Sequence, residues 1–116
     1  MTIQRYEVGP RMSQAVVHNG LAYLAGIVAD DLVPSVGDQT RQILAKIDRL
    51  LALVGSDKTR ILKANIWLSD ISRFAEMNAV WDTWVAKGEP PARATVEARL
   101  AGPDYLVEIM VEAAVA

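Results

Sequence analysis

Residues 90–100 read Pro-Pro-Ala-Arg-Ala-Thr-Val-Glu-Ala-Arg-Leu. The two prolines cannot continue a helix, and each biases the residue before it toward an extended backbone. From Arg93 to Leu100 polar and apolar side chains alternate strictly, which predicts a strand with one polar and one apolar face. The polar face of this predicted strand carries Arg93, Thr95, Glu97 and Arg99.

Arg93 is held directly after a rigid turn, which makes it a candidate anchor for a ligand. A fixed guanidinium can bind a carboxylate through two parallel hydrogen bonds. The competing interpretation is an ion-pair ladder along the strand, because Glu97 shares the predicted face of Arg93. Spacing alone favours the ladder, since most strand arginines are solvated or pair with a neighbouring acid.

The composition indicates a soluble globular chain of 116 residues, 52% of them apolar, with a net charge of -2. We expect a single domain over residues 1–116, because this length supports one core. No apolar run is long enough to cross a bilayer, and the first residues lack the long apolar core of a signal peptide, so we expect a cytoplasmic protein without a membrane partner.

The residue types also limit the possible sites. The chain has no cysteine, which excludes disulfides and thiolate metal sites. Its single histidine, His18, leaves too few good ligands for a zinc site, so we expect no metal. Lysines and arginines are dispersed rather than clustered, and we therefore expect no nucleic-acid partner.

The first thirty residues predict three strands. A short edge strand is expected near residues 3–8, and Asn19-Gly20 between two apolar runs predicts a tight hairpin. The second strand of that hairpin is expected to continue through residues 25–29. Gly26 in this strand indicates a bulge, or a close approach by a backbone or ligand.

Two amphipathic helices are expected, from Asp38 to Val54 and from Asp70 to about Val85. Gly55 is well placed to cap the first helix, and Asp70 to cap the second. The predicted apolar stripes are Ile43, Ile47, Leu50, Leu51 and Val54 on the first helix, and Phe74, Met77, Asn78, Trp81 and Trp84 on the second.

Two further strands complete the chain. The first lies between the two helices, where every second residue is apolar: Leu62, Ala64, Ile66 and Leu68. The second spans residues 106–114 and places Leu106, Glu108, Met110 and Glu112 on one face. If the last two strands pair, Glu108 or Glu112 comes near the face of Arg93.

The predicted order is β-β-β-α-β-α-β-β, an α+β fold in which a mixed sheet carries both helices on one face. Strand-helix-strand connections are right-handed, and two of them that wind the same way place both helices on the same face of the sheet. The other face keeps apolar side chains such as Leu106 and Met110. Because such a face is too apolar to remain in water, we expect self-association and a site where subunits meet.

Several motifs, in this order and spacing, resemble the RidA/YjgF family of reactive-intermediate (enamine/imine) deaminases, over residues 13–113. They are Gln39-Thr40 through Gly55-Ser56, Ile66-Trp67-Leu68-Ser69-Asp70, Met77-Asn78, Pro91-Ala92-Arg93-Ala94-Thr95-Val96-Glu97 and Val107-Glu108-Ile109. The resemblance implies a chorismate-mutase-like α+β fold. It also implies a homotrimer with a central barrel and sites in the clefts between subunits.

The resemblance further implies roles for single residues. Arg93 would hold the carboxylate of a small substrate, Glu108 would orient or activate water, and Asn78 would lie near the site. The implied reaction is hydrolysis of 2-imino acids, formed from enamines such as 2-aminoacrylate, to 2-keto acids and ammonia. No cofactor or metal is implied.

The chain departs from the best-characterised deaminases in the implied substrate-binding residues. Met12 stands in place of a tyrosine, Ala25-Gly26-Ile27 in place of Ser-Gly-Gln, and Thr95 in place of a cysteine. These changes predict a more apolar pocket and a divergent subgroup of the family.

Two alternatives to the deaminase remain. The first is a small-carboxylate-binding or regulatory protein on the same trimeric fold, without turnover. The second is the endoribonuclease or translation-inhibitor role sometimes attached to the family, against which the acidic balance and the single histidine speak.

Overall fold

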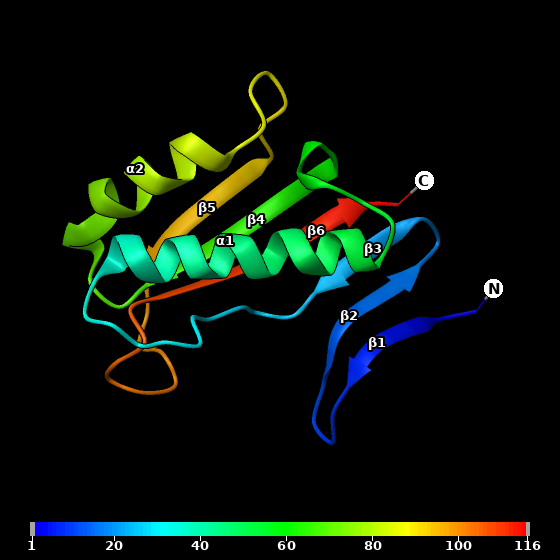
Figure 1. Ribbon diagram of the computed structural model, residues 1–116, viewed down its shortest axis with the longest axis horizontal. Coiled ribbons are helices and arrows are strands. Elements are labelled where there is room, and N and C mark those ends of the chain that lie inside the picture. Colours follow the sequence, from blue (N-terminus) through cyan, green and yellow to red (C-terminus); the bar gives the residue numbers. More distant parts are fainter. Residues whose placement is uncertain (1, 116) are drawn as a thin grey trace.

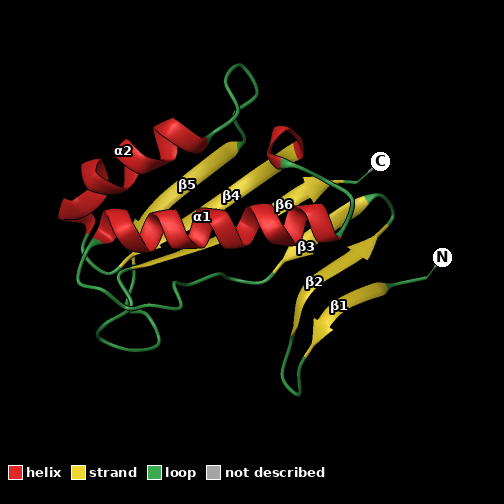
Figure 2. Cartoon of the chain, viewed as in Figure 1, coloured by secondary structure: helices red, strands yellow, loops and turns green. Residues whose placement is uncertain are grey.

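A computed structural model describes residues 2–115 and contains one mixed sheet with two helices across one of its faces (Figure 1). The strand order is β1-β2-β3-β6-β4-β5, and Figure 2 shows both helices on the same side of this sheet. The predicted α+β fold and its element order are therefore confirmed. The strands are Gln4–Val8 (β1), Ser13–His18 (β2), Leu21–Leu24 (β3), Ile61–Leu68 (β4), Ala92–Glu97 (β5) and Val107–Ala114 (β6), and the helices are Val36–Leu53 (α1) and Phe74–Trp84 (α2).

The predicted hairpin joins β2 to β3. Asn19 and Gly20 both have positive φ, 54° and 75°, as a tight hairpin turn requires. His18 pairs with Leu21 across the turn, and β1 lies on the outside of β2 as the predicted edge strand.

The strand predicted to continue through residues 25–29 is interrupted instead. β3 ends at Leu24 and its pairing with β6 stops at Tyr23, whereas the N–H of Ala25 still donates to the carbonyl of Gln14 at the start of β2. The chain returns at Ile27, which exchanges two hydrogen bonds of 2.8 and 3.0 Å with Ile109. Gly26 therefore lies at a break in the strand, directly beside β6.

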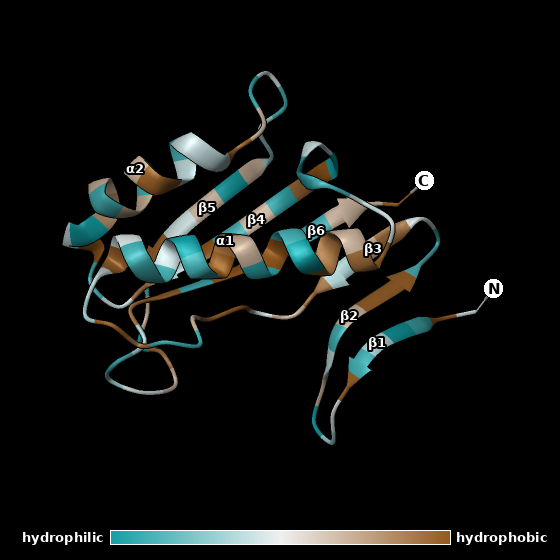
Figure 3. Ribbon diagram, in the orientation of Figure 1, coloured by the Kyte–Doolittle hydropathy of each residue, from teal (hydrophilic) through white to brown (hydrophobic). Residues whose placement is uncertain are grey.

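Local sequence signals account for both ends of α1. Ser35 caps its start, because the Ser35 hydroxyl accepts from the N–H of Asp38 at 3.2 Å, and α1 begins two residues before the predicted Asp38. At the other end Gly55 has φ +80°, and the N–H groups of Gly55 and Ser56 donate to Ala52 and Leu51. The predicted apolar stripe is buried, and Figure 3 shows hydrophobic and hydrophilic residues alternating along α1.

Gln39 on α1 is fully buried and holds a loop in place. Its side-chain amide donates to the carbonyls of Val33 and Asp104, each at 2.9 Å, and its oxygen accepts from the N–H of Leu106 at 3.0 Å. The loop between β5 and β6 is thereby attached to α1.

The predicted second helix begins as a 3-10 turn, Ile71–Arg73, and becomes α-helical only at Phe74. Asp70 caps the turn by accepting from the N–H of Ser72 at 3.0 Å. Met77 and Trp81 are buried as predicted, but Phe74 is 41% exposed, and Val80 is buried instead.

Leu62 does not belong to the buried row of β4. A bulge between Ile61 and Lys63 shifts the alternation, so Leu62 is 51% exposed while Ala64, Ile66 and Leu68 are buried. The three remaining positions of the predicted row are confirmed.

The two faces of β5 are reversed from the prediction, and the strand ends at Glu97 rather than Leu100. Arg93 and Thr95 pair with the buried residues Ala64 and Ile66, so they lie on the side of the helices. Val96, on the predicted apolar face, is 50% exposed. The reversal is possible because α2 presents aromatic rings to β5, and a long arginine side chain can pack on rings.

The sheet face away from the helices, here called the open face, carries exposed apolar side chains. Tyr23, Val96 and Met110 are 41%, 50% and 39% exposed. Leu106 is not among them, because it precedes β6 and packs against the core. Within residues 2–115, neither helix has the length and apolar character that crossing a membrane requires.

Candidate functional site

The guanidinium of Arg93 lies against α2. It donates a hydrogen bond of 2.8 Å to Asn78 Oδ1, and its carbon lies 5.2 Å from the ring centre of Trp81 and 5.7 Å from that of Phe74. A planar guanidinium stacks on aromatic faces and keeps its edge N–H groups available. Within residues 2–115 no carboxylate pairs with Arg93. The geometry provides an oriented cation at the sheet edge.

Thr95 lies two residues further along the same side of β5. Its hydroxyl oxygen is buried and has no hydrogen-bond partner within the described residues. An unpaired buried hydroxyl is costly, and such a group in a native structure calls for an explanation. The hydroxyl lies on the same side of β5 as Arg93.

Glu108 occupies the open face, opposite Trp67 of β4. A Cβ added to Gly26 would lie 2.2 Å from Glu108 Oε2, so the carboxylate packs directly on the Gly26 backbone. Burial raises the pKa of Glu108 above the usual value of a glutamate. The group that closely approaches Gly26 is therefore the side chain of Glu108, rather than the backbone or ligand that the sequence predicted.

Met12 and Gly26 line one hollow of about 380 Å³ on the open face, together with Ser13, Val16, Tyr23, Leu24, Ala25 and Met110. Met12 itself is 58% exposed. Because Gly26 also contacts Glu108, this mostly apolar hollow adjoins the carboxylate.

Arg93 and Glu108 point to opposite faces of the sheet within one chain. β4 lies between β5 and β6, so the last two strands do not pair, and the predicted approach of Glu108 or Glu112 to the face of Arg93 is wrong. The predicted ladder is also absent, because Glu97 Oε1 accepts from the N–H of Ile71 at 3.1 Å. The candidate residues form two separate groups, an arginine group at the sheet edge and a glutamate group on the open face.

The remaining titratable candidates are structural. His18 Nδ1 lies 3.3 Å from the carbonyl of Thr2, beside the hairpin turn, and Glu112 pairs with Lys63 at 3.2 Å. Within residues 2–115, no three His, Cys, Asp or Glu side chains gather as they would to hold a metal ion.

Sequence reasoning missed two features. The rings of Phe74 and Trp81 follow the spacing i, i+4, i+7 with Asn78, a signal that could have placed all three around Arg93. A cavity of about 710 Å³ beyond the carboxyl ends of β4 and β5 had no such signal, because a loop folding back from residue 98 to 106 makes most of it.

Known proteins match this chain over nearly its whole length. Residues 2–115 match the family model described as Endoribonuclease L-PSP. A RutC family protein of Haemophilus influenzae is 46% identical over 112 residues, covering 96% of this chain and 97% of the relative. The RutC family protein YoaB of Escherichia coli is 45% identical over 115 residues, covering 99% of this chain and all of the relative.

Solved structures agree with these matches. NMB1025 of Neisseria meningitidis, a member of the YjgF protein family, superposes with a TM-score of 0.97 at 49% identity, covering 100% of this chain and 97% of that one. YyfA of Yersinia pestis, of the conserved Rid protein family, superposes with a TM-score of 0.86 at 33% identity over 93% of this chain and 90% of that one. The chain belongs to the RidA/YjgF family, whose members include the RutC proteins.

Proposed function

We propose that the protein hydrolyses reactive 2-imino acids to 2-keto acids and ammonia. The observation that carries the proposal is that the Arg93 guanidinium lies over two aromatic rings and has no carboxylate partner among residues 2–115. A substrate carboxylate supplies the missing partner through paired hydrogen bonds.

Glu108 is the proposed proton-transfer group. A glutamate works best as an acid or base when its pKa lies near the working pH, and burial moves the pKa of Glu108 in that direction. The carboxylate of Glu108 packs directly on the backbone of Gly26, because glycine has no side chain to separate the two groups.

The proposed reaction needs only water as co-reactant. Glu108 takes a proton from water as the water oxygen bonds to the imine carbon, the C=N electron pair moves to nitrogen, and Glu108 passes the same proton to that nitrogen. Glu108 then takes the hydroxyl proton of the resulting carbinolamine and returns it to the amine nitrogen, as the C–N bond breaks, the C=O bond forms and ammonia leaves. Positioning of the acid end by Arg93 and proton transfer by Glu108 supply the catalysis.

Arg93 and Glu108 face away from each other in one chain, so the proposal requires more than one subunit. We assign Arg93 to one subunit and Glu108 to its neighbour in a homotrimer. The exposed apolar residues of the open face, Tyr23, Val96 and Met110, favour such an assembly.

The test is the hydrolysis rate of 2-imino acids generated in place by an amino-acid oxidase and trapped competitively. Wild type should accelerate hydrolysis, and Arg93→Ala and Glu108→Gln should each lose it by about 100-fold or more. Arg60→Ala and Glu112→Gln are the matched controls, since Arg60 is an exposed arginine and Glu112 shares the strand and face of Glu108. No acceleration by folded, oligomeric wild type for any imine would exclude the deaminase.

A second candidate is binding of a small carboxylate without turnover. The apolar hollow beside Glu108, lined by Met12 and Ala25, favours it, because a pocket poor in polar groups gives water little orientation. Calorimetry with 2-keto acids separates the two. Binding that is lost in Arg93→Ala and kept in Glu108→Gln, with no turnover by wild type, identifies the binding protein.

A further inference from the structure

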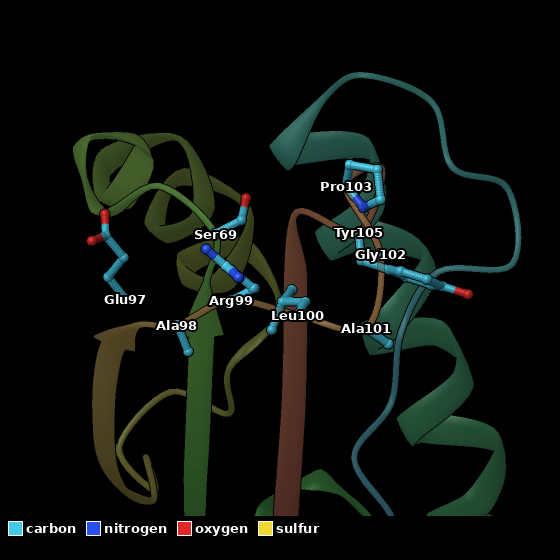
Figure 4. Close-up of a pocket in the computed structure, with 9 residues that line it drawn as sticks. All are labelled: Ser69, Glu97, Ala98, Arg99, Leu100, Ala101, Gly102, Pro103 and Tyr105. Atoms are coloured by element: carbon cyan, nitrogen blue, oxygen red, sulfur yellow. The ribbon is translucent and has the colours of Figure 1, made fainter.

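A cavity of about 710 Å³ lies where β4 and β5 end and the chain turns back toward β6 (Figure 4). Ser69 and Glu97 line it from the strand ends, and the loop from residue 98 to Tyr105 forms the opposite wall. Arg93 stands at the start of β5 and Arg99 beyond its end, six residues or about 20 Å apart in an extended chain. The cavity is therefore separate from the Arg93 group.

Arg99 is an exposed arginine that lines this cavity. The structure records no hydrogen bond or ion pair for its guanidinium within residues 2–115, and Figure 4 shows the group directed toward Ser69. The acid nearest in sequence, Glu97, points away from it and accepts from the N–H of Ile71. An anion is the ligand that this arrangement lacks.

The rest of the lining is apolar and fixed. Leu100, Pro103 and the ring of Tyr105 contribute carbon surface, and a Cβ at Gly102 would lie only 3.3 Å from that ring. The loop is held at both ends, because the N–H of Ala98 donates to the carbonyl of Leu68 at 2.9 Å and Gln39 binds the backbone of Asp104 and Leu106. A wall that is already ordered loses little conformational freedom when a ligand binds.

We propose that this cavity is a second ligand site, for a small monocarboxylate with an apolar body. The Arg99 guanidinium and the Ser69 hydroxyl bind the carboxylate, and the apolar body lies against Leu100, Pro103 and Tyr105. A dianionic phosphate fits less well, because the Glu97 carboxylate lines the same cavity and repels the second charge. The site is separate from Arg93, and Arg99 and Leu100 also line a neighbouring hollow of about 250 Å³ that Glu108 reaches.

The probe is benzoate, titrated into the ¹⁵N-labelled full chain and followed by amide and arginine Nε chemical shifts. Saturable shifts are expected at Ser69, Gly102 and the Arg99 Nε. Arg99→Gln should weaken the affinity about tenfold or more, because a charge-assisted pair is lost. Arg60→Gln removes the same charge from an exposed arginine elsewhere and should leave the affinity unchanged.

Two further measurements keep the result specific to this cavity. In Arg93→Ala the shifts at Ser69 and Arg99 should persist, whereas shifts confined to the surroundings of Arg93 would overturn the proposal. Equal affinity of wild type and folded Arg99→Gln would also overturn it, as would tighter binding of inorganic phosphate at the same residues.

Discussion

Arg93 Nη1 donates to Asn78 Oδ1 at 2.8 Å, between the rings of Phe74 and Trp81. The hydrogen bond joins the edge strand β5 to helix α2, so the orientation of the proposed anchor depends on a second element. Asn78 uses one guanidinium N–H, and the other N–H groups form no hydrogen bond to a side chain within residues 2–115. This arrangement makes Asn78 a positioning residue for the proposed carboxylate site.

Replacing Asn78 tests that role. In Asn78→Ala the Arg93 guanidinium keeps its aromatic neighbours but loses its fixed orientation, so KM for a 2-imino acid should rise about tenfold while kcat changes less. Asp82→Ala, on the exposed side of the same helix, is the control and should change neither constant. A fall in kcat with unchanged KM would contradict the positioning role.

Gly26→Ala tests the contact beneath Glu108. The added Cβ would lie 2.2 Å from Glu108 Oε2, so the carboxylate must move. Turnover should fall by about tenfold or more, while binding of a 2-keto acid through Arg93 is retained. Gly9→Ala is a matched control, because its Cβ would meet only the Met12 carbonyl at 3.4 Å. Full activity of Gly26→Ala would show that the position of Glu108 is unimportant.

The raised pKa of Glu108 makes a prediction for stability against pH. Burial disfavours its charged form, so the native state binds this proton more tightly than the unfolded state. The associated stabilisation is present below the ordinary pKa of a glutamate, about 4.3 in unfolded chains, and is lost as the pH rises through the raised value. The test is urea unfolding of wild type and Glu108→Gln at pH values about one unit apart from 4 to 7. The free energy of unfolding of Glu108→Gln should rise relative to that of wild type as the pH increases. A difference that stays constant with pH would contradict the shift.

Gln39 should be among the costlier polar residues to replace. Gln39→Leu leaves the carbonyls of Val33 and Asp104 and the N–H of Leu106 without their partner. We expect a loss of about 2–4 kcal/mol in the free energy of unfolding, measured in urea. Gln42→Ala, which removes two hydrogen bonds to exposed Asp31, should cost less than about 1 kcal/mol. Equal losses would mean that burial of Gln39 adds nothing.

The open face gives a prediction for assembly. Met110→Lys places a charge among Tyr23 and Val96, so the proposed homotrimer should dissociate in sedimentation velocity. Leu53→Lys is the control, since Leu53 is equally an exposed apolar residue but lies on α1. A wild-type chain that sediments as a monomer would remove both the assembly and the shared site.

The sequence by itself determined most of the local structure. Asn19-Gly20 specified the hairpin, because few other residues accept positive φ at both positions of the turn. Gly55 and Asp70 marked helix boundaries through their own backbone and side-chain hydrogen bonds. The alternation in residues 107–113 correctly separated the face of Glu108 from the buried face. All these signals act within a few residues of the chain.

Only the tertiary structure decided the arrangement of the candidate site. Which face of β5 is covered depends on the aromatic rings of α2, and the separation of Arg93 from Glu108 depends on β4 lying between their strands. Likewise the orphan hydroxyl of Thr95 and the cavity around Arg99 arise from segments that meet only after folding. The alternation of polar and apolar residues along a strand indicates that its two faces differ. Which face is buried depends on the elements that pack against each one.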